Sequence, residues 1–328
     1  MTHFVLRPES VPQVGDAIAE GDAAIRQIRR LVGRMAIATL ILMAIGSATR
    51  VMNAGLACPD WPLCYGTLFP GQQMNLQVFL EWFHRLDAAF LGLSAITLVG
   101  FSLWQRRHLP TWVPKASGLA LGLIVFQGVL GGLTVTEMLR FDIVTAHLGT
   151  ALLFFVTLLV MWAMLTPHQG VGTAGNLPWV SLLAAVLVYV QSLLGALVGS
   201  QWAAHQCLSQ SGLCTVLYSH LVGVVPPTLA TLAVVAIAWR TPALHPVLRR
   251  WALLAGGCLG LQLLLGLGTL YLHLQVEPLT VAHQSVGALL LGSLVGITVL
   301  GWRDRVSDDP IPADAALLSG ANPANAQS

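Results

Sequence analysis

The sequence predicts an all-α integral membrane protein with eight transmembrane helices, arranged as two tandem four-helix bundles related by a pseudo-two-fold axis along the membrane normal. Three observations predict this fold. Charged residues make up only 9% of the 328 residues and the mean hydropathy is +0.74, whereas a soluble domain is about 25% charged. Several segments are apolar over roughly the 20 residues that a spanning helix needs. Finally, the two halves of the chain repeat one another.

The expected transmembrane helices fill most of the chain. They cover residues 31–52, 76–103, 116–137, 142–165, 178–200, 215–239, 250–273 and 279–302. Very short links predict antiparallel hairpins between the third and fourth helices and between the seventh and eighth, the latter with Pro278 near a helix start. The expected domains are a cytoplasmic tail (1–30), a first four-helix unit (31–165), a cytoplasmic linker (166–177), a second four-helix unit (178–302) and a cytoplasmic tail (303–328).

Basic residues predict how the helices are oriented, because cytoplasmic loops of membrane proteins carry an excess of Lys and Arg. Such residues cluster before the first helix and after the second, sixth and eighth, and these places share one side if the helices alternate. The opposite side has only Arg50, Arg85 and Arg140. We therefore expect both termini to be cytoplasmic. Residues 1–30 resemble neither a secretory signal nor an Arg-rich transit peptide, so a bacterial plasma-membrane protein is expected and an organellar membrane is the alternative. The links expected to face outward are 53–75, 138–141, 201–214 and 274–278.

An internal repeat relates the two halves. His84 and His147 are separated by the same number of residues as His220 and His283. The sequence TAHLGTALL around His147 also resembles VAHQSVGALL around His283. We therefore expect two four-helix units in the same orientation.

These four histidines are candidate ligands. Ionisable residues inside a membrane mark functional sites by default, and each histidine is expected near the outward end of its helix. Two facing imidazoles suit the axial positions of a haem iron, whose other ligands come from the porphyrin. A non-haem metal would need three or more close protein ligands, and neither pair has a convincing third. The sequence favours one bis-histidine haem per unit. Nearby glycines such as Gly131 and Gly266 would admit a flat macrocycle, although small residues also simply pack membrane helices.

Glu81 is present in only one unit. It lies three residues before His84, on the same helix face, whereas Leu217 precedes His220 by the same interval. A carboxylic acid in an apolar site suits proton transfer near neutral pH. The alternative is that Glu81 only forms a salt bridge to Arg85, one turn further on. Arg85 would equally suit a haem propionate.

Two pairs of cysteines lie in outward links. Cys58 and Cys64 belong to CPDWPLC, and Cys207 and Cys214 belong to CLSQSGLC. Closely spaced cysteines that face an oxidising compartment favour disulfides. We expect a structural disulfide for the second pair, whereas a redox role for the first pair stays open. Cys258, within the seventh helix, is expected to be inert.

The remaining polar residues receive no assigned role. Gln127 and Gln262 occupy equivalent places of the repeat, and Asp87 lies one turn after the first histidine. His205 and His273 face outward but lack partners in the repeat. No role is expected for His3, His108, His168 and His245.

Together these residues resemble the haem A synthase family. The resemblance rests on EWFHR, an ExxHR pattern, on the outer-link cysteines with CPDWPLCYG, and on four symmetric histidines in eight helices. It extends over about residues 31–302. Members of this family oxidise a methyl group of haem O to a formyl group, which produces the haem A of aa3-type terminal oxidases.

The resemblance implies different roles for the two units. It implies that His220 and His283 bind a resident haem b. It also implies that His84 and His147 bind the substrate haem O, with Glu81 as the catalytic carboxylate. Both cysteine pairs match the family's outer-link pairs. Besides the lipid bilayer, haem O synthase and the assembly machinery of aa3-type oxidases are the expected partners, and a homo-oligomer stays open.

Two other functions fit parts of the sequence less well. A bis-histidine di-haem protein would pass electrons through the membrane, but such proteins normally place their haems at opposite depths, and all four histidines are expected near the outer face. A haem or metal transporter would not explain why only one unit carries Glu81. Nucleic-acid binding is not expected, since Lys115 is the only lysine among 16 basic residues.

Overall fold

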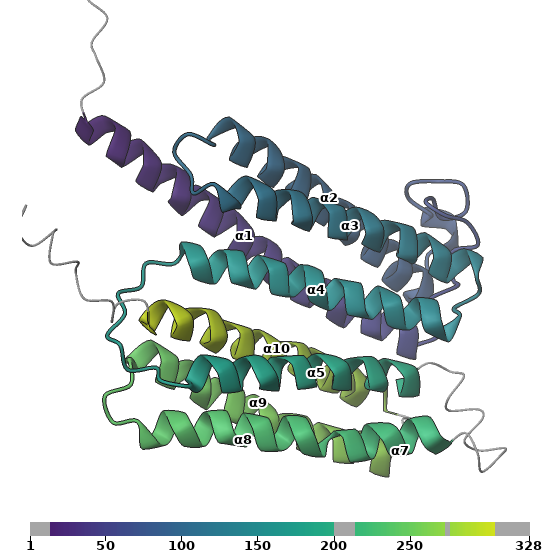
Figure 1. The fold of residues 1–328 in the computed structure, drawn as a ribbon. Coiled ribbons are helices and arrows are strands. Elements are labelled where there is room, and N and C mark those ends of the chain that lie inside the picture. Colours follow the sequence, from purple (N-terminus) through teal and green to yellow (C-terminus); the bar gives the residue numbers. More distant parts are fainter. Residues whose placement is uncertain (1–13, 200–213, 273–275, 306–328) are drawn as a thin grey trace, which may run out of the picture. The chain divides into compact units, whose positions relative to one another are not determined.

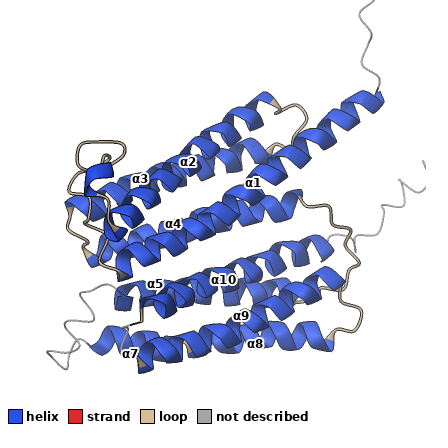
Figure 2. Cartoon of the chain, turned by 180° about the vertical axis from the view of Figure 1, so that it is seen from behind, coloured by secondary structure: helices blue, strands red, loops and turns tan. Residues whose placement is uncertain are grey.

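The computed structural model describes residues 14–199, 214–272 and 276–305, and the long elements in these ranges are all α-helices (Figures 1 and 2). Within them, eight helical segments are long and apolar enough to cross a membrane, which confirms the predicted all-helical fold with eight spans. The helices are α1 (Val14–Val51), α2 (Leu76–Trp104), α3 (Trp112–Thr136), α4 (Phe141–Leu165), α5 (Leu177–Gly199), α7 (Cys214–Gly223), α8 (Val225–Arg240), α9 (Pro246–Tyr271) and α10 (Glu277–Arg305), with a short 3-10 helix at Gly71–Gln73.

Helix α1 begins at Val14, well before the predicted start at residue 31. The early part of the helix is polar overall, but Ala24, Ile28 and Val32 recur at every fourth position and are all buried. Residues at this interval share one face of a helix. The helix therefore extends into the stretch predicted as a tail because one face of that stretch packs against protein.

The sixth predicted helix is interrupted at Val224, between α7 and α8. Pro226 and Pro227 follow the interruption. Proline lacks the N–H that would bond to the carbonyl four residues earlier, and its ring clashes with that carbonyl. The two helices still form one apolar segment of sufficient length for a span, Thr215–Arg240.

The chain divides into two compact units, residues 1–166 (unit 1) and 167–328 (unit 2). In unit 1, α1 and α3 each pack against both α2 and α4, so α2 and α4 lie across the bundle from each other. In unit 2, α5 and α9 each pack against both α8 and α10, so that α8 and α10 lie across from each other.

Asp304, near the end of α10, holds the link between α4 and α5 in place. Its carboxylate is fully buried and accepts hydrogen bonds from the backbone N–H groups of Val171, Thr173 and Ala174 at 2.8–2.9 Å. One buried carboxylate therefore satisfies three backbone donors of an irregular segment, which stabilises that segment.

Candidate functional site

One pair of histidines lies inside each unit. His84 of α2 faces His147 of α4, with ring centroids 6.5 Å apart and 64° between the ring planes. His220 of α7 faces His283 of α10, with centroids again 6.5 Å apart and an angle of 79°. The structure therefore brings together both pairs that the sequence predicted.

Each imidazole rests on a glycine of a neighbouring helix. A Cβ added to that glycine would come close to Cε1 of the histidine, and at three of the four positions the separation would be 3.0 Å or less. Glycine at these places therefore makes room for the ring. The separations are 2.7 Å for Gly46 and His84, 3.4 Å for Gly131 and His147, 3.0 Å for Gly195 and His220, and 2.9 Å for Gly266 and His283.

The geometry of both pairs fits a haem. Metal–imidazole bonds are about 2 Å long, so facing rings whose centroids are 6.5 Å apart leave room for one metal ion between them. Among the described residues, the buried Nδ1 atoms of His84, His147 and His283 have no hydrogen-bond partner. In the same part of the chain, no group of three His, Cys, Asp or Glu side chains is placed to hold a bare metal ion. An iron whose other ligands come from a porphyrin fits this donor set.

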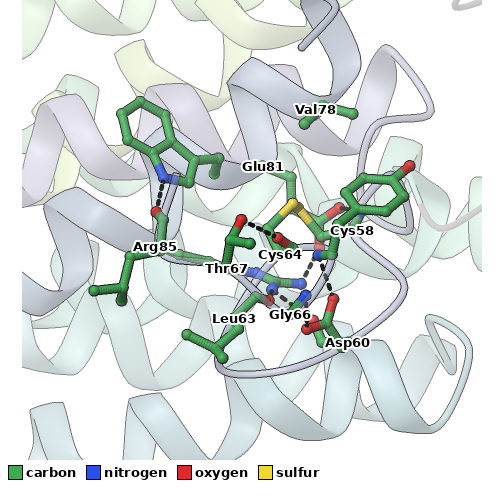
Figure 3. Close-up of a disulfide and its surroundings, with 12 residues drawn as sticks. Cys58, Asp60, Leu63, Cys64, Gly66, Thr67, Val78, Glu81 and Arg85 are labelled. Carbon is green, nitrogen blue, oxygen red and sulfur yellow. Dashed lines mark hydrogen bonds and ion pairs between the residues drawn. A yellow bond between two sulfur atoms is a disulfide. The ribbon is translucent and has the colours of Figure 1, made fainter. Parts of the chain in front are cut away.

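The link between α1 and α2 carries a disulfide. Cys58 and Cys64 are bonded, with their Cα atoms 4.8 Å apart, and both are buried against Val78 of α2 (Figure 3). Trp61 of the same link lies against α3, where a Cβ added to Gly132 would be 3.2 Å from its indole ring. The predicted disulfide is confirmed, and its loop is packed against two helices of unit 1.

Glu81 is 4% exposed, and both of its carboxylate oxygens are engaged. Oε2 accepts a hydrogen bond from the backbone N–H of Cys58 at 2.8 Å, and Oε1 pairs with Nη2 of Arg85 at 2.5 Å. Nη1 of Arg85 donates to the backbone carbonyls of Asp60 and Leu63 (Figure 3). The Glu81–Arg85 salt bridge that the sequence suggested is therefore formed. It belongs to a network that joins α2 to the disulfide loop.

Unit 2 has no carboxylate at the place that corresponds to Glu81. Leu217, in α7, lies three residues before His220 and is partly buried. The predicted Cys207–Cys214 disulfide lies outside the described residues, because Cys207 and the side chain of Cys214 are not described. The same holds for His205 and His273. The second disulfide stays a prediction.

Glutamine side chains also contact the histidines. Gln127 and Gln262, which have no predicted role, are two of these glutamines; the third, Gln191, contacts His220 and was not predicted. A signal was available in the sequence, because each of these glutamines stands four residues before a glycine that supports a histidine.

Cys258 is buried and not disulfide-bonded.

This fold and these sites define a multi-pass α-helical membrane protein with a histidine pair in each four-helix unit and a buried glutamate–arginine pair beside a disulfide loop. A model of the COX15-CtaA family, described as "Cytochrome oxidase assembly protein", matches residues 29–295. The chain belongs to this family. Membership implies that the chain binds haem.

Curated relatives agree with this placement and confirm the resemblance predicted from the sequence. A haem A synthase of Shewanella oneidensis is 27% identical, over 82% of this chain and 95% of the relative. The haem A synthase of Agrobacterium fabrum is 28% identical, over 92% of this chain and 97% of the relative. That of a Caulobacter species is also 28% identical, over 83% and 94%.

Proposed function

We propose that unit 1 converts haem O to haem A while unit 2 keeps a haem b. The chain is a haem A synthase, an oxidoreductase that acts on haem O, as its family and relatives indicate. One observation supports the assignment of the reaction to unit 1 and of the resident haem to unit 2. Unit 1 has a buried carboxylate, Glu81, three residues from a histidine of its pair, whereas unit 2 has Leu217 at that place.

The histidine pairs hold the two haems. His84 and His147 bind haem O, and His220 and His283 bind haem b. When bound, the iron porphyrins supply one-electron redox chemistry. The chain positions each porphyrin between two helices that lie across a bundle, and the glycines beneath the imidazoles set how far each ring projects into the bundle.

Glu81 is the catalytic carboxylate of this proposal. In the oxidation of a methyl group to a formyl group, hydrogen leaves the carbon as protons and electrons and an oxygen atom is added, so a fixed base beside that methyl group favours the reaction. The N–H of Cys58 and the guanidinium of Arg85 fix the orientation of the carboxylate, and hydrogen bonds to a charged group are among the stronger ones. In this position Glu81 accepts a proton released at the methyl carbon or stabilises positive charge that develops there.

Arg85 has a second role in the proposal. Its guanidinium already bonds Glu81 and the loop carbonyls of Asp60 and Leu63. A guanidinium has five N–H donors in a fixed geometry, so others are left for a propionate of haem O. Arg85 would then couple three things: the substrate, the catalytic carboxylate and the disulfide loop.

The arrangement in the membrane follows the distribution of basic residues. Both termini lie in the cytoplasm of a bacterial cell, and the two haem sites lie towards the outer face of the plasma membrane. The repeat of the histidine motifs supports a pseudo-two-fold relation between the units. Haem O synthase and the assembly machinery of aa3-type oxidases are the proposed partners.

Replacement of Glu81 tests this function. Glu81→Gln keeps the size and a carbonyl acceptor for the Cys58 N–H but removes the base. We expect the purified variant to retain haem and, when co-expressed with a haem O synthase, to accumulate haem O without haem A. Glu137→Gln is the control, because Glu137 is exposed in the link between α3 and α4. A normal yield of haem A from Glu81→Gln would contradict the catalytic assignment.

A further inference from the structure

Each histidine of the two pairs rests on a glycine of a neighbouring helix, and a second position of that helix lies four residues before the glycine. These two positions share one face of the helix. In three of the four cases the earlier residue is a glutamine whose side-chain amide contacts the histidine. The earlier residues are Leu42 for His84, Gln127 for His147, Gln191 for His220 and Gln262 for His283.

The three glutamine side chains reach the histidines that they face. Two of the amides donate to the backbone carbonyl of the histidine, and two lie within contact distance of a ring nitrogen. Nε2 of Gln127 lies 2.9 Å from the backbone carbonyl of His147. Nε2 of Gln191 lies 2.7 Å from the backbone carbonyl of His220 and 3.0 Å from its Nδ1. Nε2 of Gln262 lies 3.3 Å from Nε2 of His283.

His84 lacks this contact. Leu42 is buried in α1 and stands where the other three positions have glutamine, but its side chain has no hydrogen-bonding group. His84 therefore rests on its glycine, Gly46, without an amide to hold it. In unit 2 both histidines are held by glutamines, and in unit 1 only His147 is.

Such contacts restrict how a ligand moves. Hydrogen bonds between helices have modest strength in a membrane, but partners of metal-binding histidines fix ring orientation and raise affinity for the metal. A histidine whose backbone or ring is held by an amide would keep its orientation towards a bound metal. A histidine without that contact has more freedom to turn away.

We infer that Gln191 and Gln262 are positioning residues that retain the haem of unit 2, and that Leu42 makes His84 the exchangeable ligand through which unit 1 takes up haem O and releases haem A. The inference rests on the proposed function, in which one haem stays and the other is exchanged in every turnover. His84 is also the histidine on the same helix as Glu81. The ligand that opens therefore lies beside the proposed catalytic carboxylate.

Loss of haem from the purified protein tests the first half of the inference. The detergent-solubilised protein with its bound haem is mixed with excess apomyoglobin, and transfer of haem is followed by absorbance. We expect Gln191→Leu and Gln262→Leu each to speed the loss of the resident haem by about 3- to 20-fold, as expected for losing one interhelical hydrogen bond in a membrane protein. Gln105→Leu, in the link after α2, is the control.

A spectroscopic signal separates positioning from general loosening of the bundle. The EPR signal of low-spin ferric haem depends on the angle between its two axial imidazole planes, which is 79° for the pair in unit 2. We expect Gln191→Leu to shift this signal and Gln105→Leu to leave it unchanged. If Gln191→Leu does not fold, Gln191→Asn shortens the side chain by one methylene and is expected to give the same shift. Wild-type EPR signals and wild-type rates of haem loss in the folded variants would overturn the inference.

Leu42→Gln tests the second half. We expect this variant, loaded with haem O, to release it about 3- to 20-fold more slowly than the wild type. Ile41→Gln is the matched control, because Ile41 is the adjacent residue of α1 but is 53% exposed. Equal release from the two variants would overturn the role of Leu42. A wild-type protein that holds no haem at all would instead contradict the proposed function, so the two failures are distinguishable.

Discussion

Glycine-to-alanine changes beneath the histidines test whether these rings hold the haems. At Gly266 the added carbon would lie 2.9 Å from Cε1 of His283, which is too close for an undisturbed ring, so the imidazole must move. Overpacking of this kind costs about 1–3 kcal/mol, which corresponds to about 5- to 140-fold weaker binding of the resident haem. In unit 1 the same argument predicts a larger loss of haem O affinity for Gly46→Ala, at 2.7 Å, than for Gly131→Ala, at 3.4 Å.

The assay is a haem titration. Protein produced under haem limitation is titrated with haem b, and the low-spin absorbance band gives the Kd for unit 2. Gly118→Ala is the matched control, because a Cβ at this helical glycine would meet nothing within 4 Å. The reasoning is refuted if folded Gly266→Ala, as judged by its thermal unfolding, binds haem b with the Kd and spectrum of Gly118→Ala.

Three further predictions concern the loop and the link. Replacing Cys58 and Cys64 with Ser removes a cross-link of sequence separation 6, and we expect a loss of about 2 kcal/mol in the free energy of unfolding; an unchanged Tm in detergent would contradict this. Asp304→Ala leaves three backbone N–H groups without their acceptor, at roughly 1–3 kcal/mol each, and should make residues 166–176 sensitive to protease, with Asp304→Asn intermediate; equal resistance of all three proteins would contradict it. Burial, His245 and Arg303 lower the pKa of His168, and Asp304 opposes them. This pKa is lower in the folded chain than in the unfolded chain, where it is about 6.5. The free energy of unfolding is therefore highest above about pH 6.5 and decreases as the pH falls below that value. The backbone N–H of Gly172 donates to the backbone carbonyl of Asp304 at 3.2 Å. Its hydrogen-exchange protection should therefore decrease from about pH 7.5 to about pH 5.5, and His168→Gln should remove this dependence; a pH dependence that survives in His168→Gln would contradict the assignment.

Most of the helices were predictable because apolar length is a strong signal in a membrane protein. The two differences have local causes. The start of α1 was missed because a count of apolar residues does not register a narrow buried face such as Ala24, Ile28 and Val32. The interruption at Val224 was missed although Pro226 and Pro227 are visible in the sequence, because prolines in membrane helices do not always end the helix.

The candidate site was predictable to the extent that it repeats. The histidine pairs were predicted from equal spacings in the two halves of the chain. Glu81 was singled out because the corresponding position of the second half is occupied by Leu217. The bond between Glu81 and the backbone of Cys58 was not predictable, because it joins a side chain to an irregular loop 23 residues away. Gln191 was missed because its interval to a glycine has meaning only once that glycine is known to support a histidine.

Haem extraction from the wild type and from two histidine variants tests the central claim most directly. Each protein is purified from cells that also express a haem O synthase, and its haems are identified by chromatography. The proposed division of roles predicts that His220→Ala lacks the resident haem b, whereas His84→Ala keeps haem b but contains no haem A. Loss of haem b from His84→Ala together with its retention in His220→Ala would contradict that division.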